Sequence, residues 1–126
     1  MDHQPPHQPG WHVLLDLHGA RHLADAARIE AVLTGAAAAA GAQVIASHFH
    51  AFPGRAGVTG MVLLAESHIS IHTWPELGLA ALDIFMCGAC DVQAARRHVE
   101  AALQPTHVTL VEVLRGRDQR NHRSQP

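Results

Sequence analysis

Residues 65–76 place several reactive side chain types on one short stretch of chain, which reads AESHISIHTWPE. Ile69 and Ile71 alternate with polar neighbours, a spacing that predicts a strand with one apolar face. The opposite face then carries His68, Ser70, His72 and Trp74. A solvated sheet face with chance histidines is one interpretation. A reactive site is the other, and the neighbouring Glu66 and Ser67 favour it.

The basic residues exclude one common route to amine chemistry. All 9 of them are arginine, and the chain contains no lysine. An enzyme that holds pyridoxal phosphate as an internal aldimine needs a lysine amine. If this protein acts on amines through a carbonyl group, we therefore expect that carbonyl to come from another source and not from pyridoxal phosphate.

Length and composition indicate one soluble domain. The chain has 126 residues and is 48% apolar, with no apolar run long enough for a bilayer and no signal-peptide layout. The net charge is -2, so no broad basic field favours nucleic acid. Two cysteines three positions apart do not make a secreted disulfide framework. We expect a cytoplasmic protein that binds neither nucleic acid nor membrane.

The order of predicted elements indicates an α+β fold. Residues 1–10 are rich in proline, glutamine and histidine and are expected to form a disordered arm, residues 11–117 a single domain, and residues 118–126 a loose tail. Strands are predicted at 11–17, 43–52, 58–65, 68–74, 79–87 and 107–114, and helices at 23–40 and from the N-cap Asp91 to Leu103. The order β-α-β-β-β-β-α-β predicts a two-layer α/β sandwich, with a mainly antiparallel sheet and two helices on one face. The other face is then solvated or buried against a second copy.

A four-residue loop at 75–78 fixes the register of the predicted hairpin. With Trp74 opposite Leu79, the further pairs are Ser70 with Asp83, His68 with Phe85 and Glu66 with Cys87. The alternation of both strands then collects polar side chains on one face and sets Cys87 beside the Glu66–Ser67 peptide bond. Asp83 on that face is either a buried structural acceptor or a catalyst.

The same hairpin places His72 far from Ser67. Four strand residues separate His68 from His72, a span of about 13 Å at ~3.3 Å each. If His72 acts at Ser67, we expect a second protomer, packed on the uncovered sheet face about a two-fold axis, to supply it.

The chain resembles the short prokaryotic S-adenosylmethionine decarboxylases, which are pyruvoyl-dependent proenzymes. The resemblance runs from about Trp11 to Arg117. It is carried by ESHISIHTWPE at 66–76 and DIFMCG at 83–88, with HVLLDL at 12–17, GVTG at 57–60 and RG at 115–116.

The resemblance implies that the chain cuts itself between Glu66 and Ser67. The serine attacks the preceding carbonyl, and elimination and hydrolysis leave a pyruvoyl group on residues 67–126, separate from residues 1–66. The pyruvoyl ketone forms a Schiff base with the substrate amine. Cys87 then matches the proton donor, and His72 and Thr59 match the processing residues, where many members carry serine in place of Thr59.

The resemblance also implies substrate contacts. An aromatic side chain that stacks on adenine matches Phe52, and a glutamate that bonds the ribose hydroxyls matches Glu76. Trp74 is a core aromatic or a second surface on which a planar ligand stacks.

Metal and redox interpretations stay open beside this one. Cys87 and Cys90 form a C-x-x-C pair, which suits a redox pair or half a zinc site, although Cys90 also suits a bystander at a helix start. His48 and His50 share a strand face and could form half a metal site, whereas His68 and His72 are too far apart for one zinc ion. We expect no required metal.

Three functions remain at this point. The first is an S-adenosylmethionine decarboxylase that supplies the aminopropyl donor for spermidine and other polyamines, working as a homodimer of cleaved protomers. The second is a pyruvoyl-dependent arginine or ornithine decarboxylase on the same scaffold. The third is a binding module that never cleaves, against which the intact set of Ser67, His72 and Cys87 argues.

Overall fold

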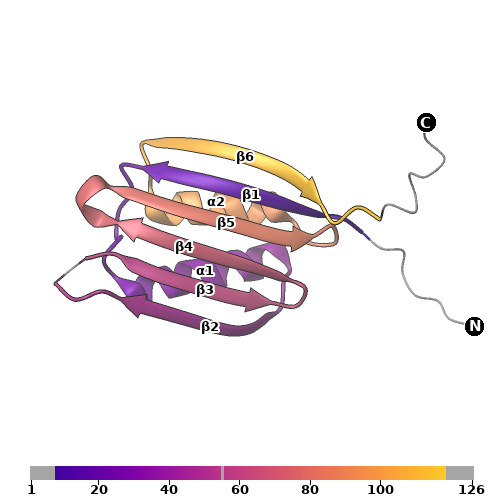
Figure 1. Ribbon diagram of the computed structural model, residues 1–126, viewed down its shortest axis with the longest axis horizontal. Coiled ribbons are helices and arrows are strands. Elements are labelled where there is room, and N and C mark those ends of the chain that lie inside the picture. The colour runs from indigo at the N-terminus through magenta and orange to yellow at the C-terminus, as the bar shows by residue number, and fades with distance from the viewer. Residues whose placement is uncertain (1–7, 55, 119–126) are drawn as a thin grey trace, which may run out of the picture.

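The computed structural model describes residues 8–54 and 56–118, which form a six-stranded sheet covered by two helices (Figure 1). The elements are β1 (Gly10–His18), α1 (Ala26–Ala40), β2 (Val44–Ala51), β3 (Val58–Leu64), β4 (Ser67–Trp74), the 3-10 helix η1 (Pro75–Leu77), β5 (Leu79–Cys87), α2 (Val92–Leu103) and β6 (His107–Arg115). The strand order is β2-β3-β4-β5-β1-β6. Every neighbouring pair is antiparallel.

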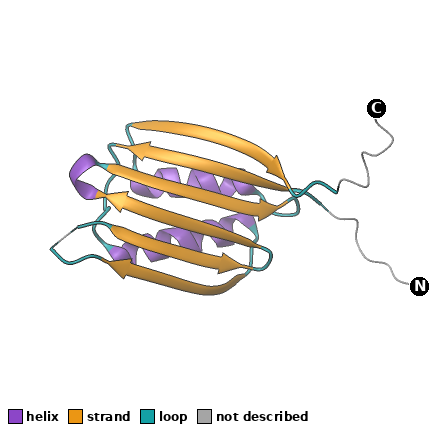
Figure 2. Ribbon diagram, in the orientation of Figure 1, coloured by secondary structure: helices purple, strands orange, loops and turns teal. Residues whose placement is uncertain are grey.

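Both helices lie on the same face of the sheet, as Figure 2 shows. Strand alternation explains this, since β5 buries every second residue from Ala80 to Met86 and leaves the intervening ones half-exposed. Gly35 of α1 lies against His98 of α2, where a β-carbon would approach the imidazole Nε2 to 2.6 Å, so a side chain at this position would require the His98 ring to move. The predicted α+β sandwich with two helices on one face is confirmed.

Capping residues set the helix bounds. The side chain of Asp25 accepts a hydrogen bond from the amide of Arg28, so α1 begins at Ala26 and not at residue 23 as predicted. Gly41 ends α1 in the left-handed region with φ of 80°. Asp91 caps α2 as predicted by accepting from the amide of Ala94.

One other predicted bound shifts slightly. Gly10 is buried and starts β1, where it pairs with Cys87 and Arg115, so it does not belong to an N-terminal arm. Residues 1–7 of the predicted arm and residues 119–126 of the predicted tail lie outside the described residues. Among the residues that are described, no helix is long and apolar enough to cross a bilayer.

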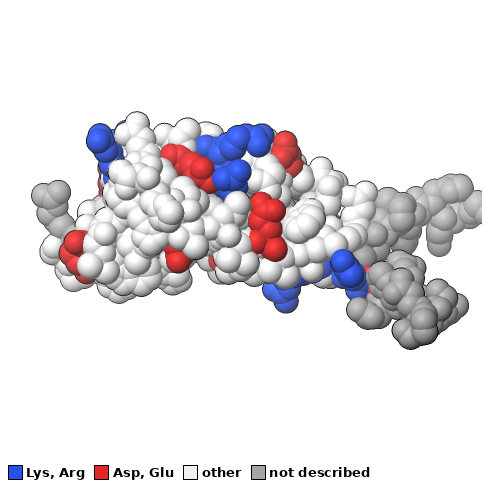
Figure 3. Space-filling model, turned by 90° about the horizontal axis from the view of Figure 1, so that it is seen from above, with Lys and Arg blue, Asp and Glu red and all other residues white. Residues whose placement is uncertain are grey.

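The sheet face opposite the helices is exposed and partly apolar. Its side chains include several large hydrophobic groups that are between 41% and 50% exposed: Leu14, Met61, Leu63, Val111 and Val113. On the side of the molecule seen in Figure 3, basic and acidic side chains are interspersed and no extended field of one sign appears.

Candidate active site

Ser67 opens β4 beside the end of β5. Its hydroxyl oxygen accepts a hydrogen bond of 3.3 Å from the backbone N–H of Cys87, and the residue is 8% exposed. The predicted register is confirmed, because Trp74 pairs with Leu79 and His68 pairs with Phe85. Cys87 therefore lies directly beside Ser67.

Glu66 does not pair with Cys87 as the hairpin register suggested. It lies in the turn between β3 and β4 with φ of 62°, a left-handed conformation that residues other than glycine rarely adopt. The turn tightens the chain and removes Glu66 from the ladder. Such a conformation costs of order 1 kcal/mol or more, so the peptide bond before Ser67 follows a strained residue.

Cys87 has a second thiol nearby. Its Sγ lies 4.0 Å from Sγ of Cys90, and both cysteines are free and half-buried. Burial raises the pKa of the Cys90 thiol, and the neighbouring Cys87 raises it further. Within the part of the chain that the structure describes, neither cysteine belongs to a group of three side chains close enough to hold one metal ion.

His72 and Thr59 form a pair at the other end of β4. Thr59 Oγ1 lies 3.2 Å from Nδ1 of His72, and the two residues are partners in the β3–β4 ladder. Five strand residues separate His72 from Ser67, or about 17 Å at ~3.3 Å each. The structure thus joins the two predicted processing residues to each other but not to Ser67 of the same chain.

The three predicted substrate-binding residues gather at the end of the sheet where His72 lies. Trp74 ends β4 and is 40% exposed, with its ring 6.4 Å from that of His72. Glu76 follows in η1. Phe52 leaves β2 beside the start of β3, is 46% exposed and contacts the ring of His50 at 4.7 Å.

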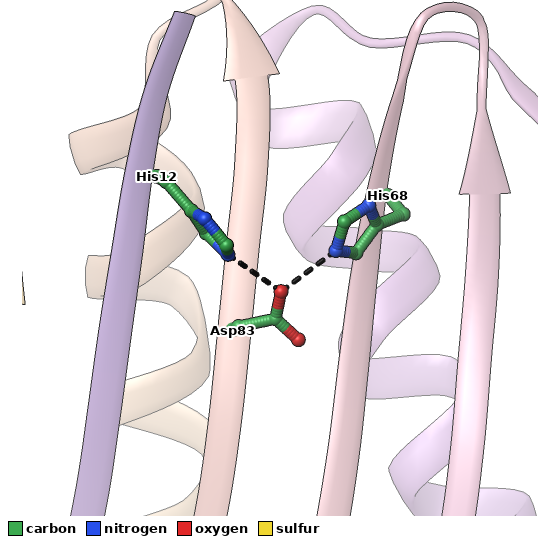
Figure 4. Close-up of side chains that lie close together, drawn as sticks. All are labelled: His12, His68 and Asp83. Carbon is green, nitrogen blue, oxygen red and sulfur yellow. Dashed lines mark hydrogen bonds and ion pairs between the residues drawn. The ribbon is translucent and has the colours of Figure 1, made fainter. Parts of the chain in front are cut away.

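Asp83 is the centre of a polar cluster on the exposed face. Its Oδ2 lies 2.7 Å from Nε2 of His12 and 2.7 Å from Nε2 of His68 (Figure 4), and its Oδ1 accepts from the hydroxyl of Ser70. Burial alone would raise the pKa of this carboxyl, but the hydrogen bonds from Ser70, His68 and His12 outweigh it and lower the pKa. Asp83 therefore accepts hydrogen bonds from three side chains, as its predicted structural role requires.

Sequence reasoning did not single out His12. Its outward position follows from the alternation of β1, in which Val13, Leu15 and Leu17 are buried. What the sequence does not give is the strand order, which sets β1 next to β5 and so brings His12 to Asp83. A polar residue on the outer face of a central strand is the signal that could have found it.

His12, His68 and Asp83 are also the group best placed to hold a metal ion among the described residues. Their ligand atoms all lie within 4.8 Å of one another. A guanidinium N–H of Arg115 lies 3.1 Å from Nδ1 of His12, however, and a fixed positive charge there opposes a divalent cation. His48 and His50, the predicted half site, lie on the exposed strand β2.

Two surface hollows adjoin these elements. The larger, of about 490 Å³, lies at the start of α1, and neither hollow is lined by Ser67 or Cys87. The smaller, of about 260 Å³, lies on the exposed sheet face and is bordered by Asp83, Ser70 and His72. The smaller hollow is the relevant one, since its walls carry the polar side chains of the site.

Comparisons with known proteins identify the family of this chain. A family model described as S-adenosylmethionine decarboxylase matches residues 11–116. The S-adenosylmethionine decarboxylase proenzyme of Caldicellulosiruptor saccharolyticus is 41% identical over 113 residues, which cover 87% of this chain and 90% of that protein. The proenzyme of Methanococcus vannielii is 42% identical over 112 residues, covering 86% and 91%.

A solved structure shares the fold as well. The crystal structure of the adenosylmethionine decarboxylase from Aquifex aeolicus superposes with a TM-score of 0.78 at 37% identity, covering 90% of this chain and 95% of that one. With the matches in sequence, this likeness establishes that the chain belongs to the S-adenosylmethionine decarboxylase family.

Proposed function

We propose that this chain is the proenzyme of a pyruvoyl-dependent S-adenosylmethionine decarboxylase that cleaves its own backbone between Glu66 and Ser67. The observation that carries the proposal is the placement of Ser67, with a strained Glu66 before it and the Cys87 N–H at its hydroxyl. The product, decarboxylated S-adenosylmethionine, supplies aminopropyl groups for spermidine and related polyamines.

The residues around Ser67 suit a pyruvoyl group. Ser67 is small and almost buried, and the neighbouring strand presents a thiol. The absence of lysine from the chain leaves no amine to anchor pyridoxal phosphate. The pyruvoyl group supplies a ketone, which binds the substrate amine covalently and accepts the electron pair released when carbon dioxide leaves.

Within this chemistry Cys87 serves as the proton donor to the product. Its thiol belongs to the strand paired with the start of β4, two positions beyond Phe85, the partner of His68. A positioned acid typically contributes 10²–10⁴-fold to the rate of such a step. Free thiols at Cys87 and Cys90 suit a reducing compartment, so we place the enzyme in the cytoplasm.

A homodimer brings the processing and substrate-binding residues of one chain to Ser67 of the other. His72, Thr59 and the substrate-binding residues Phe52, Trp74 and Glu76 all lie at the end of the sheet remote from Ser67. A two-fold axis through the exposed sheet faces sets that end of one protomer against the Ser67 end of its partner. The apolar side chains exposed on this face, including Leu14 and Val111, suit such an interface.

In the dimer His72 of the partner accepts the proton that Ser67 gives up during processing, and Thr59 orients its imidazole. Phe52 and Trp74 contact the adenine and Glu76 the ribose hydroxyls. Arginine or ornithine as the substrate has no support from the family model or from the relatives described above.

The intact mass of the purified protein tests the proposal. We expect two fragments, 1–66 and 67–126, with the second lighter by one ammonia than plain hydrolysis gives. Release of carbon dioxide should then occur from S-adenosylmethionine and not from arginine or ornithine. A catalytically competent but uncut chain would overturn the proposal, and an uncut chain with no activity would favour a binding module.

A further inference from the structure

A row of hydrogen-bonded side chains crosses the exposed sheet face and ends next to Ser67. Arg115 of β6 contacts His12 at 3.1 Å, and His12 contacts Asp83 at 2.7 Å. Asp83 is in turn 2.7 Å from His68, the residue bonded directly to Ser67. The row therefore joins the edge strand β6 to the start of β4 through β1 and β5. Figure 4 shows three of its members, His12, Asp83 and His68.

The contact with Arg115 fixes the tautomer of His12. A guanidinium can only donate, so Nδ1 of His12 accepts and carries no hydrogen. The remaining hydrogen then lies on Nε2, which donates to Oδ2 of Asp83. The lowered pKa keeps Asp83 ionised, so it also accepts from Nε2 of His68. Each ring in the row thus has a defined orientation.

Processing removes other restraints at this end of β4. Cleavage cuts the link to Glu66, and conversion of Ser67 eliminates its hydroxyl and with it the hydrogen bond from Cys87. The strand then begins at a free end, and chain ends fray unless they are tied down. The hydrogen bond from His68 to Asp83 does not depend on the peptide bond or on the hydroxyl, so it survives processing.

We propose that Arg115, His12 and Asp83 are positioning residues that hold His68, and through it the pyruvoyl group carried on the amide of His68, in one place after cleavage. This inference rests on the proposed self-processing. It assigns no chemical step to the row. A group that must meet both the substrate amine and the thiol of Cys87 reacts fastest when its geometry is held close to the reacting one.

Hydrogen exchange across a matched set of proteins tests the inference. The measured quantity is the rate of amide exchange in a peptide that covers the start of β4. It is compared between the cleaved wild type and the uncut Ser67→Ala chain, each with and without Asp83→Asn. We expect Asp83→Asn to speed exchange about tenfold or more in the cleaved protein, since a hydrogen bond to a charged group stabilises by about this factor or more. In the uncut chain the intact backbone should limit the increase to a small fraction of that.

Arg115→Gln provides a second variant outside β4; it also removes the guanidinium that lies 5.8 Å from the centre of the Phe85 ring in β5. It should speed exchange of the same peptide in the cleaved protein, but by less than Asp83→Asn does. The effects of the two substitutions on the exchange rate should not be additive. The cleaved variants should also show a lower kcat with little change in KM. A larger share of the 67–126 fragments should begin with alanine, as expected when the proton goes to the pyruvoyl carbon instead of the substrate carbon.

Several outcomes would overturn the inference. Equal exchange effects in cut and uncut chains would make the row an ordinary fold contact, and failure of both variants to cleave would show that it acts before the new end exists. A stabilisation by zinc that Asp83→Asn abolishes would replace the row with a metal site. An uncut wild type, seen by intact mass, would contradict the proposed function. A cut wild type whose exchange at the start of β4 is the same with and without Asp83→Asn would contradict this inference alone.

Discussion

Thr59 Oγ1 lies 3.2 Å from Nδ1 of His72, across the ladder between β3 and β4. This hydrogen bond makes the two residues one unit. A histidine that takes up a proton at Nε2 must carry a hydrogen on Nδ1, and Thr59 is the acceptor for that hydrogen. The unit lies at the end of β4 remote from Ser67 of the same chain.

Complementation between two inactive chains should therefore restore cleavage. A His72→Ala chain keeps Ser67 but lacks the base, and a Ser67→Ala chain keeps the base but cannot be cut. When the two are produced together, the His72→Ala chain should be cleaved, because its partner supplies His72. Intact mass distinguishes the two chains. If His72 acts within its own chain, the mixture stays uncut.

The control for this experiment is a block on dimer formation. Val111→Asp puts a charge on the exposed apolar sheet face, where Val111 is 50% exposed, and should prevent both association and complementation. Ala31→Glu puts a charge on an exposed position of α1, on the opposite layer, and should prevent neither. Sedimentation of the uncut Ser67→Ala chain, with and without each charge, reports the association.

Replacement of Thr59 should change the rate of processing. Thr59→Val keeps the shape but removes the acceptor, so the His72 tautomer is no longer fixed and cleavage should slow by about tenfold, the worth of one hydrogen bond of this kind. Thr59→Ser keeps the hydroxyl on a side chain with freer χ1 and should cleave at least as fast as wild type. The fraction cut over time, followed by mass, measures both. Equal rates for valine and threonine would remove Thr59 from the processing machinery.

Most of the fold follows from patterns that lie close together in the sequence. Alternation in the stretch from Ile69 to Met86 fixed both faces of the hairpin, and the loop at 75–78 fixed its register. The apolar Leu23 predicts an earlier start of α1 than the structure has, although Asp25 provides the stronger start signal. The turn at Glu66 was missed because a left-handed residue other than glycine leaves no mark in the sequence.

The sequence predicts the site only where its residues lie close together in the chain. Ser67, His72 and Cys87 belong to one hairpin, so their relative positions followed from pairing alone. Asp83 and His12 lie 71 positions apart in the sequence, and His12 and Arg115 lie 103 positions apart. These depend on the placement of β1 between β5 and β6, which no local pattern specifies.

Cys87→Ala should separate processing from turnover. The backbone N–H that bonds Ser67 remains, so the chain should still be cut. Loss of the thiol should reduce kcat by about 10²–10⁴-fold, the usual contribution of a positioned acid. The fraction of 67–126 fragments that begin with alanine should rise. Cys90→Ala, which removes the neighbouring thiol and keeps Cys87, is the matched control and should retain turnover. Wild-type kcat in Cys87→Ala would refute the assigned role.

The stability supplied by Asp83 should vanish in acid. Its folded-state pKa is lowered, so the unfolded chain takes up a proton first, and the stabilisation is present above the unfolded pKa of about 3.9 and is lost as the pH falls through the folded value. Unfolding by urea, measured in the uncut Ser67→Ala chain, should show Asp83→Asn to be less stable by about 1–3 kcal/mol from pH 5 to 7, because His12, His68 and Ser70 lose a charged acceptor. As the pH falls below about 4 the difference should shrink, and it should disappear below the folded-state pKa of Asp83.

Asp16→Asn is the control for net charge in this comparison. It removes a charge from an exposed position on the same face and should cost less stability at pH 7 than Asp83→Asn does. If the chain with Asp83→Asn stays less stable by the same amount below about pH 3, where the carboxyl is protonated in the unfolded chain, then the shape of the aspartate side chain, and not its charge, holds the cluster together.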